Sequence, residues 1–422
     1  MLGSKVMTMA AALLTAGLIN RSLGPSGRGV YAEMQTWVAF FTVMFGISID
    51  SAIYHFSNRT LYGGDDKSRF VTIFLLSLSL SLLAAAGLTI FVIYFPEHVS
   101  AKTSEYILFL DVLLILSMLA STLIVFVQAL GNIRFSALIG MAQSGVNVVV
   151  ISSGYILGII NLFYVVISLI AVQTVSLAIL SREFWRSGYG TGRFSKTMVK
   201  GIITAGMKQH IATVSTFVYM KVNQLIVFRY CGESEAGVFA VALNLALYLT
   251  FLLEILRNVL YPRVIHSSDD YEVTVRSLRL GFYGWGIVVL LLILLSKPIV
   301  LIYAGRDFIS SVNVFRILLI AVWFLSLSSL LAPYYIKAGA FTIASVSAVF
   351  LGTLSVTLNF LLVPRYLSKG AAFATSLTCL TGFGITYLFL WYLSRRNPSI
   401  IFKPDFNYEF KSLKSWARQW GA

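Results

Sequence analysis

Residues 21–32 read R-S-L-G-P-S-G-R-G-V-Y-A, and residues 229–240 read R-Y-C-G-E-S-E-A-G-V-F-A. Both stretches lie between two long apolar runs, and they share Arg, Gly, Ser, Gly, Val and Ala at the same register. Gly24 and Gly232 can adopt positive φ, and Pro25 suits a turn or a helix start. A plain helix hairpin would explain the glycines but not the matching Arg, Ser and Val. This sequence repeat therefore predicts a chain built from two copies of one unit.

The composition predicts a polytopic membrane protein. The chain of 422 residues is 58% hydrophobic and only 12% charged, with a mean hydropathy of +0.84, whereas soluble domains carry about 25% charged residues. We attribute the net charge of +15 to basic cytoplasmic loops rather than to nucleic-acid binding. Cys231 and Cys379 lie far apart and the four histidines are dispersed, so we expect no disulfide, metal site or other cofactor.

The apolar runs predict an all-α fold of about twelve spanning helices, each of roughly 20 residues. The first run lacks a small-residue cleavage site and is expected to span the membrane. The basic, glycine-containing stretch 182–199 is expected to be a cytoplasmic linker between an N-lobe (1–181) and a C-lobe (200–394), followed by a tail (395–422). The expected helices are 4–21, 30–57, 70–95, 105–129, 135–158, 162–181, 200–229, 236–261, 276–303, 310–336, 341–363 and 370–394.

The register of the two copies extends beyond the opening motif. At the same offset Thr42 meets Thr250 and the turn residue Gly131 meets Gly339. Because each lobe holds six helices, both lobes start on the same side, and the repeats are expected to be parallel bundles that face a central cavity. Most basic residues outside the spans fall on one side if both termini are cytoplasmic, which predicts a multi-pass protein of the cytoplasmic (inner) membrane.

The tail carries an amphipathic pattern. Its apolar residues recur on one helical face, with basic residues toward the other, which favours an interfacial helix on an anionic leaflet over a frayed tail. The apolar positions are Phe406, Phe410, Leu413, Ala417 and Trp420.

Few ionisable residues lie inside the expected spans, and each is a functional candidate because burying it in a membrane is costly. Helix seven carries Lys208, His210 and Lys221. His210 and Lys221 are about three turns apart and share one face, with Gln224 close to it. Alternatives are that Lys208 lies near the cytoplasmic interface and that Lys221 snorkels to the outer surface.

Helix eight carries Glu254 and Arg257, close enough to pair, and helix two carries Asp50 near its inner end. The first two form either a self-neutralising structural pair or functional groups, and Asp50 lies either at the surface or buried. Cations outnumber anions on helices seven and eight, and buried cations attract anions such as phosphate groups. We find no catalytic triad, nucleotide loop or metal-ligand cluster, so no catalytic residue is assigned and no enzyme is expected.

The chain resembles the polysaccharide repeat-unit flippases, the O-antigen and capsule translocases of the multidrug/oligosaccharidyl-lipid/polysaccharide (MOP) exporter superfamily. The resemblance covers nearly the whole length and is carried by four short stretches: Arg21–Tyr31, Phe45–Ile47, Gly232–Ala240 and Pro262. It implies two six-helix bundles around a V-shaped cationic cavity. It also implies a lipid-linked oligosaccharide, usually undecaprenyl-pyrophosphate-linked, that moves from the inner to the outer leaflet by alternating access. One departure is Asn223, where many relatives carry an acid in helix seven.

The resulting hypothesis is a lipid-linked oligosaccharide flippase. Lys221 and Arg257 would attract the pyrophosphate, and the further substrate-binding candidates are Arg21, Lys208, His210 and Gln224. Asp50 and Glu254 are candidates for coupling to protons or sodium. Expected partners are membrane lipids and the glycan polymerase and glycosyltransferases of the pathway.

Two rival hypotheses remain open. A cation-coupled multidrug or small-molecule exporter of the same architecture would depend on Asp50 and Glu254 more than on the cations. A membrane enzyme such as a glycan polymerase would need a long extracytoplasmic loop, but the longest outside segment is the short stretch 96–104.

Overall fold

The computed structural model describes an all-helical membrane protein. It describes the backbone of residues 2–56, 65–266 and 269–398, and the side chains of these segments except residues 2, 55, 251–266, 341 and 342. Nine continuous helices in this part of the chain are long and apolar enough to cross a membrane. Three of the nine are each interrupted by one non-helical residue, Gly24, Gly232 or Leu367. Counting both halves of these three gives twelve spanning segments, so the expected fold class is confirmed.

The first lobe contains six spanning segments. Its helices are α1 (Leu2–Gly46, interrupted at Gly24), α2 (Ile49–Phe56), α3 (Asp66–Tyr94), α4 (Ala101–Glu105), α5 (Ile107–Ala129), α6 (Ile133–Ile156) and α7 (Leu162–Arg186). The helices α3, α4, α6 and α7 start at side-chain caps, which are Asp65, Ser100, Asn132 and Asn161 in that order. Such oxygens bond the backbone N–H groups that a helix start leaves free.

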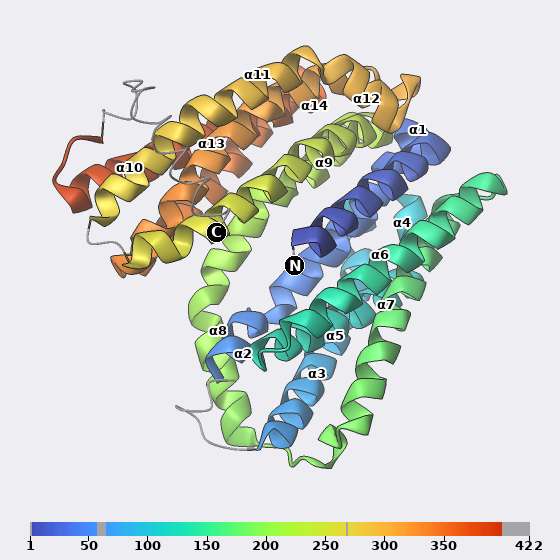
Figure 1. Ribbon diagram of the computed structural model, residues 1–422. Coiled ribbons are helices and arrows are strands. Elements are labelled where there is room, and N and C mark those ends of the chain that lie inside the picture. Colours follow the sequence, from blue (N-terminus) through green and yellow to red (C-terminus); the bar gives the residue numbers. More distant parts are fainter. Residues whose placement is uncertain (1, 57–64, 267–268, 399–422) are drawn as a thin grey trace.

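The second lobe repeats this layout. Its helices are α8 (Lys196–Phe217), a π turn (Val218–Val222), α9 (Asn223–His266, interrupted at Gly232), α10 (Asp270–Leu280), a second π turn (Gly281–Trp285), α11 (Gly286–Leu294), α12 (Ser296–Ala304), α13 (Ser311–Lys337) and α14 (Phe341–Ser394, interrupted at Leu367). Figure 1 shows the two groups of helices converging where α1 and α9 lie side by side and diverging away from that point. The expected tail helix lies outside the described residues.

The turns that open the two lobes are much shorter than expected. Gly24 (φ 62°) and Gly232 (φ 83°) are the only non-helical residues of their hairpins, so the expected helix limits 4–21 and 30–57 are wrong at this point. A positive φ is accessible to glycine at no steric cost. Pro25 then begins the next helix at a position where a backbone N–H would have no partner within the helix, so its missing N–H costs nothing. The consequence is that Arg28 and Gly29 lie inside a helix rather than in an outer loop.

The two lobes touch at a pair of equivalent glycines. A Cβ added to Gly29 would lie 1.8 Å from the carbonyl oxygen of Glu233, and one added to Gly237 would lie 1.9 Å from that of Pro25. These positions correspond under the sequence repeat, so the contact is symmetric between the lobes. We call this end of the molecule the apex. Only glycine allows two helix backbones to approach this closely.

Two further contacts cross between the lobes near the apex. Lys102 Nζ lies 3.3 Å from Glu233 Oε2, and Arg21 Nη2 donates to the carbonyl oxygen of Ile302 at 2.5 Å. An exposed ion pair such as Lys102–Glu233 contributes roughly 0–1 kcal/mol. The glycine contact therefore sets the geometry of the apex, and the polar contacts only supplement it.

At the opposite end, α8 packs on α2 of the first lobe. Gly206 has no room for a Cβ, which would lie 2.2 Å from the carbonyl oxygen of Ile47, and Ser48 Oγ donates to Thr213 Oγ1 at 2.9 Å. The helix expected over 30–57 is broken here, because Ile47 and Ser48 both have φ of 48°. Helix seven of the sequence analysis is therefore formed by α8, the π turn and the first part of α9; α8 packs on both α2 and α14, and α9 packs on both α1 and α13.

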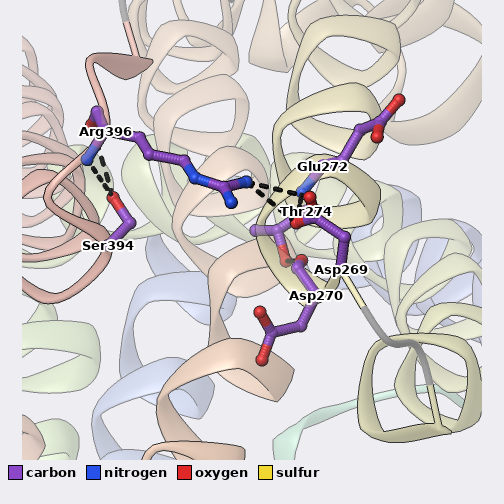
Figure 2. A network of polar contacts seen from close by, with 6 residues as sticks. All are labelled: Asp269, Asp270, Glu272, Thr274, Ser394 and Arg396. Atoms are coloured by element: carbon purple, nitrogen blue, oxygen red, sulfur yellow. Dashed lines mark hydrogen bonds and ion pairs between the residues drawn. The ribbon is translucent and has the colours of Figure 1, made fainter.

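A polar network joins three helix ends of the second lobe (Figure 2). Asp269 caps α10 by accepting from the Glu272 N–H at 3.0 Å, and Arg396 Nη1 lies 2.9 and 3.2 Å from its two carboxylate oxygens. The neighbouring Asp270 pairs with Lys337 of α13 at 3.1 Å. Hydrogen bonding from Arg396 is the main cause that lowers the pKa of the Asp269 carboxyl below its ordinary value. The network ties the start of α10 to the end of α13 and to the chain after α14.

Candidate functional site

A small cavity lies between the lobes next to the apex. The second half of α1 lines it with Arg28, Ala32, Gln35, Thr36 and Ala39, and the second lobe lines it with Lys221, Gln224, Ala240, Leu243 and Asn244. Its volume is about 70 Å³, which corresponds to two or three water molecules. Residues of both sequence repeats therefore meet in one polar hollow.

Arg28 is the most unusual residue of this cavity. It is only 3% exposed, and its Nε and Nη1 groups have no hydrogen-bond partner among the described residues. Its guanidinium lies over the ring of Tyr31, 4.9 Å from the centroid, a contact worth roughly 0.5–2 kcal/mol. Burying N–H donors of a charged group without acceptors is costly, so these donors are available for a ligand.

Lys221 lies in the π turn of helix seven. Such turns occur often at functional sites because the extra residue changes the direction in which the side chains of the turn point. Lys221 is half-buried, and the positive charge of Arg28 acts on it. Neither cation forms an ion pair within the part of the chain that the structure describes. Two neighbouring unpaired cations repel each other and favour binding of an anion.

No acidic side chain is among the described residues that line the cavity. Glu33, a buried acid on the same helix as Arg28, is occupied elsewhere: its carboxylate accepts from the Ser100 N–H at 2.9 Å, Ser100 Oγ at 2.6 Å and Thr103 Oγ1 at 2.8 Å. Glu33 therefore holds the connection before α4 against α1. The cavity keeps a positive charge with neutral polar groups around it, an arrangement suited to a phosphate-like group.

The structure brings together only some of the residues expected from the sequence. Lys221 and Gln224 line the cavity, and Gln224 Nε2 donates to the carbonyl oxygen of Ala236 at 2.9 Å. Arg21 lies instead on an apolar groove between α1 and α12. Lys208 is exposed and His210 is half-buried on α8, and neither lines the cavity.

The remaining expected residues are not in the cavity or cannot be placed in it. Asp50 is exposed on α2, near Tyr54, and has no ion-pair partner among the described residues. The side chains of Glu254 and Arg257 lie outside the described residues, so the role of Arg257 beside Lys221 stays a prediction. Asn223, the departure from the family pattern, is buried, and its Nδ2 donates to Thr375 Oγ1 at 3.0 Å.

The sequence analysis missed Arg28 and Glu33 as buried charges. Both follow Gly24 closely, and a longer outer turn would have placed Arg28 in solvent. One signal was present: Pro25 is a strong helix-start residue, and a helix that begins there places Arg28 and Ala32 on one face, one turn apart.

The twelve spanning segments in two repeated lobes define a multi-pass membrane protein. Solved structures share this fold. An inward-facing multidrug resistance MATE family transporter of the MOP superfamily matches with a TM-score of 0.71 and 15% identity, covering 94% of this chain and 96% of that one. The lipid II flippase MurJ, in an inward closed conformation, matches with a TM-score of 0.66 and 15% identity, covering 94% and 89%.

A third similar structure is a MOP superfamily transporter from Pyrococcus furiosus, with a TM-score of 0.63 and 14% identity, covering 95% of each chain. No curated protein sequence matches the chain. The model of the family described as polysaccharide biosynthesis protein matches residues 1–268. The chain belongs to this polysaccharide biosynthesis protein family, which confirms the family resemblance found in its sequence, and it shares its fold with transporters of the MOP superfamily.

Proposed function

We propose that the protein is a flippase that moves a lipid-linked oligosaccharide, carried on undecaprenyl pyrophosphate, from the inner to the outer leaflet of the cytoplasmic membrane. The observation that carries this proposal is the pair of unneutralised cations, Arg28 and Lys221, in a cavity between the lobes. A pyrophosphate group is the part of such a substrate that needs buried positive charge. A MurJ structure with the same fold is named a lipid II flippase, which agrees with this substrate class.

The geometry supports alternating access. The lobes are in backbone contact at the apex, while at the other end they are joined through α8. If the apex faces outward, with both termini in the cytoplasm, the outer side is closed and the cation pair lies just below the closure. The headgroup would then reach Arg28 and Lys221 from the cytoplasmic leaflet, and separation of Gly29 from Gly237 would release it outward.

The experiment compares alanine and charge-preserving substitutions in cells whose surface glycan depends on this protein. A charge-assisted hydrogen bond contributes about 1.5–3 kcal/mol, so Arg28→Ala and Lys221→Ala should each lower glycan output by roughly 10- to 150-fold. Lys221→Arg should retain most of the output. Immunoblots of the membrane fraction check that the variants reach normal levels.

Lys297→Ala is the matched control, because Lys297 is an exposed cation on α12 outside the cavity. Its glycan output should equal that of the unmodified protein. The double variant Lys221→Ala/Arg257→Ala, expected from the sequence, should also abolish output. Normal glycan from the Arg28 and Lys221 variants would refute the assignment of the site.

The alternative function is a cation-coupled multidrug exporter, and its motivation is the similar fold of the MATE family transporter. In that case drug resistance should follow expression, and Asp50→Asn or Glu254→Gln should reduce it more than the cation variants do. Efflux assays in a sensitive strain separate the two functions. A glycan polymerase and glycosyltransferases as partners, and an O-antigen repeat unit as cargo, belong to the flippase proposal and are tested with it.

A further inference from the structure

A second cavity lies inside the second lobe, on the other side of helix seven. It is bounded by the π turn, α13 and the two halves of α14, and its volume is about 250 Å³. This is close to the lower end of the range of about 300–1,000 Å³ typical of small-molecule pockets. Residues two apart in a helix point about 200° away from each other, so Tyr219 faces this cavity while Lys221 faces the inter-lobe cavity.

None of the described residues that line the second cavity is charged. Its polar groups are hydroxyls on four helical segments, set among apolar side chains such as Leu325, Leu351 and Phe389. A charged ligand would lose its hydration here without gaining a counter-charge. An uncharged ligand with apolar faces would not incur this cost.

The direction of the hydroxyl hydrogen bonds further restricts which donor and acceptor groups the ligand can carry. Thr216, Ser328 and Thr378 each donate to a carbonyl oxygen of their own helix, at 2.8, 3.0 and 2.8 Å. Their hydrogens are used, so they can offer only lone pairs to a ligand in the cavity. The hydroxyls of Tyr219 and Ser347 have no hydrogen-bond partner among the described residues and can donate as well as accept.

We propose that this cavity is a binding site for an uncharged polyhydroxy ring, such as a single sugar residue, separate from the cationic cavity between the lobes. Hydroxyl groups on the ligand would donate to Thr216, Ser328 and Thr378 and accept from Tyr219 and Ser347. The C–H faces of the ring would pack on the leucines and Phe389. Tyr219 and Lys221 lie in the same π turn, so a ligand bound in this cavity would contact the turn that holds Lys221.

The test uses the buried thiol of Cys379, which lines the cavity. Full-length protein with Cys231→Ser, in nanodiscs, is treated with methyl methanethiosulfonate, and the labelling rate is followed by mass spectrometry. Methyl glucoside is the neutral probe, and glucuronate and glucosamine are its charged counterparts. We expect methyl glucoside to slow labelling in a saturable way and the charged sugars to have little effect.

Two threonines of α14 form a matched pair of variants. Thr378 and Thr381 both donate to the carbonyl four residues earlier, but only Thr378 lines the cavity. Loss of one hydrogen bond, worth about 0.5–1.5 kcal/mol, should raise the half-protecting concentration about 2- to 12-fold in Thr378→Val and Tyr219→Phe, and leave it unchanged in Thr381→Val.

Three outcomes with the Cys231→Ser protein would overturn the proposal: a thiol that the reagent never reaches, labelling that methyl glucoside does not slow, and equal protection by the charged sugars. Equal shifts in Thr378→Val and Thr381→Val would also overturn it. The readout is binding rather than glycan export, so its failure is distinct from a failure of the flippase proposal.

Discussion

Leu367 adopts a backbone conformation that suits glycine. Its φ of 54° and ψ of −139° separate the two halves of α14, whereas the corresponding turn of the first lobe uses Gly158 with φ of 67°. A side chain in this region costs about 1–3 kcal/mol, partly offset in a Gly variant by the greater freedom of the unfolded chain. We therefore expect Leu367→Gly to stabilise the protein by about 1 kcal/mol.

Thermal unfolding in detergent measures this effect. Leu361→Gly is a control on the same element, because Leu361 is also exposed but lies within a regular helix. A glycine in a helix interior costs about 1 kcal/mol, so this control should melt lower. If Leu367→Gly also melts lower, the turn is held by the leucine side chain rather than strained by it.

The Asp269–Arg396 pair predicts a dependence of stability on pH. Arg396 lowers the pKa of Asp269 below its ordinary 3.8, and Asp269 raises the pKa of Arg396 above its ordinary value. A depressed carboxyl pKa contributes stability that is complete above the unfolded value and is lost as pH falls through the folded one. The contribution should therefore be constant near neutral pH and decrease as the pH falls below 3.8 toward the folded-state pKa.

Asp269→Asn isolates this contribution, because Asn also caps helices well but cannot form the ion pair. The difference in melting temperature between the parent and Asp269→Asn should be present at pH 7 and decrease as the pH falls below 3.8 through the folded-state pKa of Asp269. Both groups are exposed, so the difference should also decrease with added salt. A difference that does not decrease as the pH falls below 3.8 would show that the carboxylate charge is not its cause.

The candidate site could be predicted from the sequence in part. Lys221 was identified because an amine within a span, with no acid in helical reach, is costly unless it has a function. Arg28 was missed because its burial depends on the one-residue turn at Gly24 and on contact with the second lobe. The sequence around Arg28 shows neither the length of that turn nor its contact with the second lobe. Arg21 was expected as a further cation for the pyrophosphate, but it lies outside the cavity and bonds the carbonyl oxygen of Ile302.

At the level of elements, the contact between Gly29 and Gly237 predicts that alanine at either position separates α1 from α9. An added Cβ would overlap backbone atoms of the opposite helix, and backbone cannot give way as a flexible side chain can. We expect Gly237→Ala to shift the protein away from the closed apex. The measurement is labelling of a cysteine at Gln35, in the cavity, by a reagent added from the apex side.

Gly140→Ala is the control for this shift, since an added Cβ at Gly140 meets no atom within 4 Å. Labelling at position 35 should rise in Gly29→Ala and Gly237→Ala and stay unchanged in Gly140→Ala. Unchanged labelling in all three would mean that the apex adapts to the methyl group without opening.

The contact between α2 and α8 predicts a second conformational constraint. Ser48 Oγ and Thr213 Oγ1 are 2.9 Å apart, so cysteines at these positions should form a disulfide in a background without Cys231 and Cys379. We expect the cross-linked protein to lose transport and to recover it on reduction, because α8 could no longer leave α2. Ser48→Cys and Thr213→Cys alone should transport normally under oxidising conditions.

For the whole molecule, the sequence repeat predicted two parallel bundles of six helices, and this fold is confirmed. The paired positive-φ glycines at Gly24 and Gly232, and at Gly131 and Gly339, explain why a repeat in sequence became a repeat in structure. The relative position of the lobes could not be predicted, because it depends on close contacts such as Gly29 with Gly237. Single-sequence patterns carry the periodicity of a helix but not the identity of its distant partner.

The last prediction concerns movement of the lobes against each other. If transport requires the apex to open, a link across it should stop transport while leaving the fold intact. Lys102 and Glu233 come from different lobes and pair at 3.3 Å, so cysteines at these positions should accept a flexible thiol-reactive cross-linker.

Ser77 and Thr122, which bond at 3.2 Å within the first lobe, provide the matched intra-lobe disulfide. We expect the link between 102 and 233 to abolish glycan export reversibly and the intra-lobe disulfide to leave it unchanged, because each lobe moves as a packed unit. Full export with the lobes linked at 102 and 233 would exclude opening at the apex as a step of transport.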